Sequence, residues 1–302
     1  MYLQVSIAVM RRREALQTVG LGIVPVVRSE NSNRSDTTTT RLKLGQSYTT
    51  SFGETLSINN GTIMSSFLYH LYPDSPRVNG DNDKMYIFVN LDSNLEDKPS
   101  NTTRSDYEFL INGTRYDPSK KIGSVPHHRI SSVYSNIQPV FSSKDDKLRI
   151  PQRNSGGIGT AFQHDDKIHS VGIEYTNPET GAKAIWEFDQ DSINRANSEP
   201  LFSIEEFTAS SEDTTDIKTE TNITVKNTGE KGVFRAILGG VDSNHPRGIQ
   251  EDFEGNETKT MNIHIGGLRR GRKLETGQQQ DIRLTTAQGK SAVASINTGD
   301  NQ

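Results

Sequence analysis

The sequence contains no cysteine, few hydrophobic residues and no apolar run long enough to cross a membrane. Without cysteine, the chain cannot form disulfide bonds, thiolate metal sites, a cysteine nucleophile or a lipid-modified cysteine anchor. Hydrophobic residues make up 31% of the 302 residues and aromatic residues 7%, so we expect two small cores rather than one large core. The formal net charge of −4 is mild and argues against a nucleic-acid partner.

An uncharged, mostly apolar stretch of 12 residues, Leu16–Val27, lies shortly after three consecutive arginines. It is shorter than the about 20 residues that span a bilayer, but it has the length of a signal-peptide core. Arg12 and Arg13, followed by Glu-Ala-Leu, resemble a twin-arginine export signal of the kind found in exported haloarchaeal proteins. In that interpretation the protein starts at Met10 rather than Met1. The alternative is a frayed N-terminal helix with a basic start.

Residues 29–40 contain no apolar residue and cannot offset the entropy of ordering by burial, which predicts a disordered linker. From residue 41 onward, alternation of apolar and polar residues dominates and helical periodicity is scarce. We therefore predict an all-β fold of two immunoglobulin-like β-sandwiches, with no helix in the mature chain. The predicted divisions are a signal-like segment (1–28), the linker (29–40), and sandwiches at 41–200 and 201–302.

The clearest predicted hairpin joins strands at 170–175 and 184–188 through residues 177–181, a turn with proline and glycine. Its alternation directs Trp186, the only tryptophan, toward a sheet core. Residues 84–91 are apolar on both faces, as expected for a central strand that is covered on both sides.

The stretch 118–159 is polar and rich in turn residues, which predicts long loops with one short strand near 133–140. The glycine-rich residues 155–160 lack the lysine and the helix of a phosphate-binding loop, so we interpret them as a flexible turn. Asn112-Gly113 is a direct hairpin signal. Further strands are expected before and around it, at 62–72, 107–111 and 115–116.

In the C-terminal half, residues 217–225 alternate cleanly, with Thr221 and Ile223 inward and Glu220 and Asn222 outward. Short strands at regular spacing follow, which predicts a small β-sandwich of about 100 residues. These strands are expected at 201–207, 232–238, 261–265, 280–285 and 291–296.

Two resemblances support this division. Thr221–Glu230, followed by Gly-Val-Phe-Arg-Ala, resembles the strand and glycine turn of the cell-adhesion-related (CARDB-like) domain of archaeal and bacterial surface proteins. Residues 41–200 resemble the telokin-like, immunoglobulin-like domain of secreted prokaryotic lipoproteins, on the strand near Gly45, the strands around 85–91 and the strand 107–113. The resemblances imply an exported, non-enzymatic protein.

Three segments contain residues that could bind a metal ion. His164, Asp165 and His169 form the densest set, although their odd spacing separates the two histidines on an extended strand. Two oxygen-rich loops beside the strand at 84–91 contain Asp81 with Asp83, and Asp92, which calcium accepts as ligands. The alternative is ordinary turn chemistry, in which Asp and Asn side chains bond to their own backbone.

A basic cluster and a set of glycosylation motifs complete the candidates. Arg269, Arg270, Arg272 and Lys273 concentrate positive charge between two predicted strands and could bind an anionic polymer or lipid head group. The alternative is a charged loop that keeps a sheet end soluble. Asn-X-Ser/Thr motifs lie in predicted loops or on an outward strand face. The candidate glycosylation sites are Asn60, Asn101, Asn112, Asn222 and Asn256.

These patterns predict a non-enzymatic binding or adhesion protein, secreted or at the cell surface, that needs no cofactor. A cell-surface protein or an anionic polysaccharide is the expected partner, and no transmembrane segment is expected in the mature chain. One alternative is a metal-dependent hydrolase with a site from His127, His128, His164, Asp165 and His169. The other is a cytoplasmic structural β protein whose first 27 residues form a helix.

Overall fold

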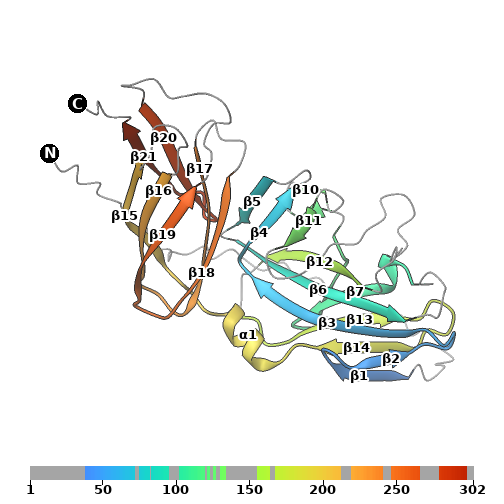
Figure 1. Cartoon of the computed structure of the whole chain (residues 1–302). Coiled ribbons are helices and arrows are strands. Elements are labelled where there is room, and N and C mark those ends of the chain that lie inside the picture. The colour runs from blue at the N-terminus through green and yellow to red at the C-terminus, as the bar shows by residue number, and fades with distance from the viewer. Residues whose placement is uncertain are drawn as a thin grey trace, which may run out of the picture. The chain divides into compact units, whose positions relative to one another are not determined.

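The computed structural model shows an almost entirely β-stranded chain (Figure 1). It describes residues 38–71, 75–81, 83–94, 102–119, 121–122, 125–126, 130–133, 155–163, 167–211, 219–240, 246–265 and 279–297. The all-β fold class predicted from the alternation is confirmed. The predicted signal segment and almost all of the predicted linker lie outside the described residues.

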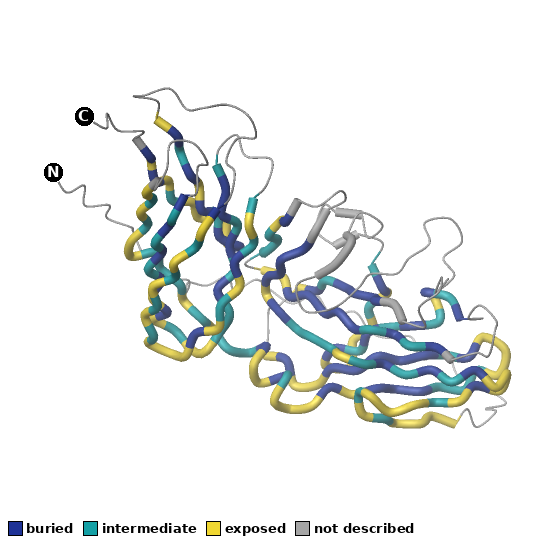
Figure 2. Tube along the Cα trace, viewed as in Figure 1, coloured by how far each residue is buried: buried dark blue, intermediate teal, exposed yellow. Residues whose placement is uncertain are grey.

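A five-stranded sheet forms one layer of the N-terminal sandwich, in the order β1-β14-β13-β7-β8. Its antiparallel hairpins β13–β14 and β7–β8 confirm the two hairpins predicted from the turns. The edge strand β1 pairs parallel to β14 and is largely exposed (Figure 2). The strands are β1 (Thr39–Lys43), β7 (Tyr107–Ile111), β8 (Thr114–Tyr116), β13 (Val171–Thr176) and β14 (Lys183–Glu187).

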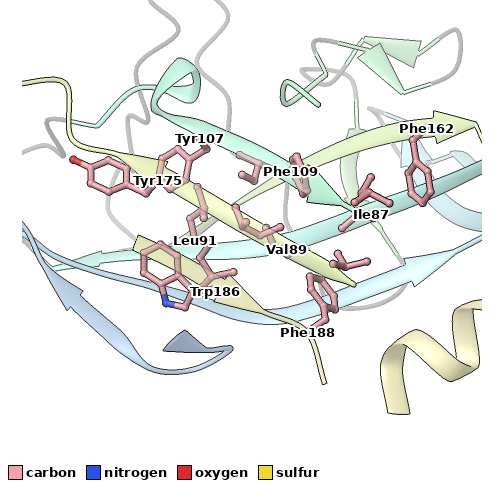
Figure 3. Close-up of a cluster of buried hydrophobic side chains, with 14 of the residues drawn as sticks. Ile87, Val89, Leu91, Tyr107, Phe109, Phe162, Tyr175, Trp186 and Phe188 are labelled. Atoms are coloured by element: carbon pink, nitrogen blue, oxygen red, sulfur yellow. The ribbon is translucent and has the colours of Figure 1, made fainter. Parts of the chain in front are cut away.

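A four-stranded sheet in the order β12-β6-β3-β2 forms the second layer. The core between the layers gathers aliphatic residues of β6 and aromatic residues of β13 and β14 (Figure 3). Trp186 is fully buried there, as predicted, and its indole nitrogen donates to Gln46 O at 2.8 Å. The strands are β2 (Ser47–Thr49), β3 (Thr55–Met64), β6 (Lys84–Asn94) and β12 (Ser155–Gln163).

A third sheet, β11-β4-β5, supplies a second covering layer for β6. Phe67 of β4 contacts the rings of Tyr86 and Phe88, which face away from the first core. This confirms that residues 84–91 form a strand covered on both sides. The strands are β4 (Ser66–Leu71), β5 (Ser75–Gly80) and β11 (Ile130–Val133), and β9 (Lys121–Ile122) pairs with β10 (Val125–Pro126).

A bulge at Asn60-Gly61 changes which positions of β3 face the first core. Leu56 and Ile58 face the first core before the bulge, and Ile63 packs against the same core after it. Met64 faces the second core. Because side chains alternate with a period of two, only an inserted residue can move the core-facing set from even to odd positions.

Three predictions about local structure were wrong. The helix α1 (Gln190–Ala196) was not expected; its seven residues are too short to show a helical period. Asp189 caps it by accepting from Ser192 N at 2.6 Å. Residues 155–160 belong to strand β12 rather than a turn, and a Cβ at Gly159 would lie 2.7 Å from the Phe88 ring. The predicted strand 62–72 is interrupted at Ser65, while most of 133–140 lies outside the described residues.

The C-terminal sandwich places β15-β16-β19 in one sheet and β18-β17-β20-β21 in the other. This division, with the chain crossing between sheets after β16, β18 and β19, is immunoglobulin-like. Along β16, the predicted alternation is confirmed from Thr219 to Val225, and the core between the sheets gathers around Phe234 and Phe253. The strands are β15 (Phe202–Ser211), β16 (Thr219–Asn227), β17 (Gly232–Gly240), β18 (Arg247–Phe253), β19 (Thr258–Ile265), β20 (Gln279–Thr286) and β21 (Ser291–Asn297).

Candidate functional site

The residues predicted to bind metal do not converge where the structure describes them. Asp81 accepts from Asp83 N at 3.1 Å and from Lys84 Nζ at 2.9 Å, and the bond to Lys84 is the main cause of the lowered pKa of Asp81. Asp81 therefore bonds to the backbone of its own turn, which was the alternative to a calcium site in these loops. Asp92 lies inside β6, not in a loop as expected, and accepts from Asn59 Nδ2.

His169 is exposed at the start of the segment leading to β13. Among the described residues, no three His, Asp or Glu side chains lie close enough together to hold a metal ion. The remaining candidates fall outside the described residues: His127, His128, His164, Asp165, the basic cluster Arg269, Arg270, Arg272 and Lys273, the export residues Arg12 and Arg13, and Asn101.

Asn227, in the C-terminal sandwich, is a fully buried polar side chain with four hydrogen bonds. Its Oδ1 accepts from Leu201 N at 3.0 Å and from Gly229 N at 3.1 Å. Its Nδ2 donates to Glu230 O at 2.5 Å and to Glu254 O at 3.0 Å. One amide group therefore holds together the start of β15, the β16–β17 turn and the β18–β19 turn.

The structure explains the glycine turn on which the resemblance to the cell-adhesion-related domain rests. A Cβ on Gly229 would lie 2.2 Å from Glu199 O and 2.7 Å from Leu201 N, so any side chain would separate these segments. Asn227 and Gly229 thus serve the packing of the sandwich end. The sequence contained these residues as a motif, but it did not show which backbone groups Asn227 binds.

Three further asparagines connect distant segments of the N-terminal sandwich in the same way. Asn112, in the β7–β8 turn, accepts from His169 N at 2.7 Å and Ser170 N at 3.1 Å and donates to Lys167 O at 3.0 Å. Its sequon therefore contains a side chain that already has a structural role.

Asn197, after α1, accepts from Ile168 N at 2.8 Å and donates to Ile168 O at 2.7 Å. This copies the paired bonds of two antiparallel strands. Asn177, in the β13–β14 turn, donates to Ser51 Oγ at 3.1 Å and accepts from Glu179 N at 2.9 Å. Because the chain has no cysteine, no disulfide bond can join these segments. Each of these amides joins them through hydrogen bonds instead.

Buried carboxyl groups lie at one end of the N-terminal sandwich, and sequence reasoning missed them. Glu54, after the β2–β3 turn, is fully buried and accepts from Ser93 Oγ at 2.5 Å. Asp106 is half-buried in the short 3-10 helix Arg104–Asp106 and accepts from Thr103 N at 2.6 Å. Burial raises the pKa of Asp106, and the nearby charge of Glu54 adds to this shift.

A second charged group lies on the outer face of the five-stranded sheet. The Glu174 carboxylate, only 3% exposed, accepts from both guanidinium nitrogens of Arg115, at 2.6 and 3.0 Å, and from Lys183 Nζ at 2.7 Å. Burial alone would raise the pKa of Glu174, but the bonds from Arg115 and Lys183 lower it overall. Arg115 also pairs with Glu108, so the network contains two positive and two negative charges, and we assign it to sheet stability.

An open groove of about 400 Å³ lies between residues 78–81 and 285–289, which belong to one compact unit of the chain. A Cβ on Gly80 would lie 2.6 Å from Ala287 O, so the two segments approach closely at this point. Thr286 Oγ1 is buried without a hydrogen-bond partner in the described residues. The groove can offer polar backbone groups to a ligand, but it brings together no set of ionisable side chains.

Arg235 lies beside this groove, and its carbonyl accepts from Ala287 N at 3.1 Å. Its guanidinium donates to Gln250 Oε1 at 3.1 Å and to Ser66 Oγ at 3.4 Å. Burial lowers the pKa of Arg235 to about 10, so the side chain stays cationic at neutral pH.

Comparisons with known proteins identify no family for this chain. No family model and no curated protein matches the chain. Among solved structures, an uncharacterised β-sandwich protein from Clostridium difficile 630 is 14% identical, with a TM-score of 0.31 over 52% of this chain and 98% of that chain. The fold class stated above rests on the strands of this chain itself. None of the described helices is long and apolar enough to span a bilayer.

We expect Asn227→Ala to lower the free energy of unfolding by about 3 kcal/mol, because it leaves buried backbone donors and acceptors without partners. Asn222→Ala is the matched control. It changes the same residue type on the same strand, at an outward position whose side chain makes no hydrogen bond to the described residues, and should cost no more than about 0.5 kcal/mol. Urea denaturation measures both values, and equal losses would contradict the role assigned to Asn227.

The raised pKa of Asp106 predicts a pH-dependent effect of removing its charge. Because the folded pKa lies above the unfolded value, the stabilising contribution of Asp106 is complete at low pH and is lost as the pH rises through the folded pKa. Relative to the wild type, Asp106→Asn should therefore be more stable at about pH 7 than at about pH 4. Thermal denaturation of both proteins across this range measures the difference in Tm. A difference independent of pH would show that burial does not perturb this carboxyl group.

Proposed function

We propose that the chain is an exported, non-enzymatic binding protein of the cell surface, in which the C-terminal sandwich carries a recognition site on its loops. The single observation that supports this most strongly is the arrangement of the connections between strands. At one end, Asn227 fixes the turns 228–231 and 254–257. At the opposite end, the strand pairing brings together one end of each of the seven strands.

The register defines this opposite end. Ser211 of β15 pairs with Thr219 of β16, which pairs in turn with Ile265 of β19. In the other sheet, Gly240 of β17 pairs with Ile282 of β20. The connections that start and finish at this end are 212–218, 241–246 and 266–278. Binding loops grouped at one end of a rigid sandwich are the usual recognition surface of this architecture.

The longest of these connections contains Arg269, Arg270, Arg272 and Lys273. Four positive charges within five positions favour an anionic polymer, and we propose an anionic polysaccharide as the partner. The resemblance of residues 201–302 to the cell-adhesion-related domain, and of 41–200 to the telokin-like domain, supports a surface protein. The likeness of Arg12-Arg13 to the twin-arginine signal of exported haloarchaeal proteins supports export.

Export is tested by changing Arg12 and Arg13 together to lysine in the full chain. Because a twin-arginine signal depends on the arginine side chains themselves, we expect the variant to accumulate inside the cell while the wild type reaches the surface or the medium. Fractionation of tagged protein measures the distribution. If both proteins accumulate in the same place, the export signal is wrong and the cytoplasmic alternative is favoured.

Binding is tested by changing the four basic residues to serine. We expect binding to dextran sulfate to weaken at least about tenfold and to lose most of its salt dependence. The Tm should stay nearly unchanged. Changing Arg269, Arg270 and Arg272 to lysine keeps the charge and is the matched control, with neutral dextran as the control polymer. A large fall in Tm, or unchanged binding by the serine variant, would show that the cluster is not the binding site.

A further inference from the structure

The turn between β18 and β19 presents an exposed asparagine, Asn256, at its surface. Asn256 is exposed, with a backbone φ of +59°, a conformation that asparagine tolerates better than most residues. No hydrogen bond of its side chain is recorded among the described residues, in contrast to Asn112 and Asn227. It begins the sequence Asn256-Glu257-Thr258, an acceptor motif for asparagine-linked glycans.

The remainder of this turn is held firmly. Asn227 N donates to Glu257 O at 2.8 Å, and Asn227 Nδ2 donates to Glu254 O at 3.0 Å. The side chain of Glu257 accepts from Glu254 N at 2.7 Å, and Lys231 Nζ pairs with Glu254 at 2.5 Å. The side chains on both sides of Gly255-Asn256 are therefore engaged, while the Asn256 side-chain amide has no partner among the described residues and lies on a fixed backbone.

At the other described Asn-X-Ser/Thr motifs, the asparagine side chain is less accessible to a glycosyltransferase. At Asn112 the amide nitrogen already donates to Lys167 O. Asn222 is half-buried on the central strand of a sheet, between neighbours on both sides. Asn60 is exposed, but it lies within strand β3, where Asn59 before it and Thr62 after it both pair with β6. A transferase that must grip the residues around the acceptor therefore finds the most open site at Asn256.

We infer that Asn256 is an attachment site for an asparagine-linked glycan, an inference that rests on the proposed export. The co-reactant is an oligosaccharide linked through phosphate to a membrane lipid, acted on by a transferase of the cell. The Asn256 Nδ2 forms a bond to C1 of the first sugar, and the C1–O bond to the lipid phosphate breaks. The lipid phosphate leaves with the bonding electrons, and the amide gives up one proton to a base of the enzyme.

The test uses the full chain purified from the surface or medium fraction of the cells that make it. Peptide mapping and intact mass should show one glycan on Asn256. Asn256→Gly keeps the left-handed turn but removes the acceptor, and Thr258→Val keeps the shape of the strand residue but removes the hydroxyl of the motif. Both should lose the glycan mass, whereas Thr258→Ser, which preserves the motif, should keep it.

The outcomes separate this inference from the proposed function. Exported protein with an unmodified Asn256 overturns the glycan site and leaves the proposed function standing. Protein found only inside the cell overturns the proposed export. In that case the folded full chain is incubated with a purified oligosaccharyltransferase and a lipid-linked oligosaccharide. Transfer to Asn256 that Asn256→Gly abolishes supports the site, while no transfer there, or preferential transfer to Asn112, contradicts it.

Discussion

The fold depends on asparagine side chains that hydrogen-bond to the backbone of distant segments. A primary amide offers an acceptor and two donors, so it can replace a missing peptide partner wherever the chain leaves a sheet. Asn112, Asn197 and Asn227 each do this at a different connection, and Asn177 donates instead to the side chain of the distant Ser51. A single such bond contributes only about 1 kcal/mol, but a buried backbone group left without a partner costs more than that. In a chain without cysteine, these amides give the loops their defined positions.

The small number of hydrophobic residues also constrains the cores. With 31% hydrophobic residues, the chain cannot fill a separate apolar layer for every sheet. Strand β6 supplies Ile87 and Val89 to one core and Tyr86 and Phe88 to another. Strand β3 likewise supplies Leu56 and Ile58 to one core and Met64 to the other. Two strands shared between two cores reduce the number of apolar residues that the fold needs.

Local patterns predicted what local physics determines. The hairpin at Asn112-Gly113, the inward direction of Trp186 and the two-sided burial of residues 84–91 follow from turn chemistry and alternation. Strand β12 was missed because its small residues show no alternation of apolar and polar side chains. The reason for a small residue is visible only in the fold, where Gly159 leaves room for the ring of Phe88. The partners of the asparagines were missed because they are distant in sequence; Asn177 and Ser51 are 126 positions apart. Among the candidate sites, the motif at 221–230 could be recognised from the sequence. Only the fold showed that Asn227 in this motif acts as a clamp, because its amide binds the backbone of three separate segments.

The clamp also gives the C-terminal sandwich two ends with different properties. The end that contains Asn227 has short turns whose backbone groups are bonded to one another, and Asn256 lies at its surface. The end at Ser211, Gly240 and Ile265 receives the three longer connections, including the one with the basic cluster. A glycan on the clamped end would be separated from the other end by the length of the strands, roughly 25 Å for an eight-residue strand. Modification and recognition can therefore occupy the same small domain, because the rigid sheets keep the two surfaces apart.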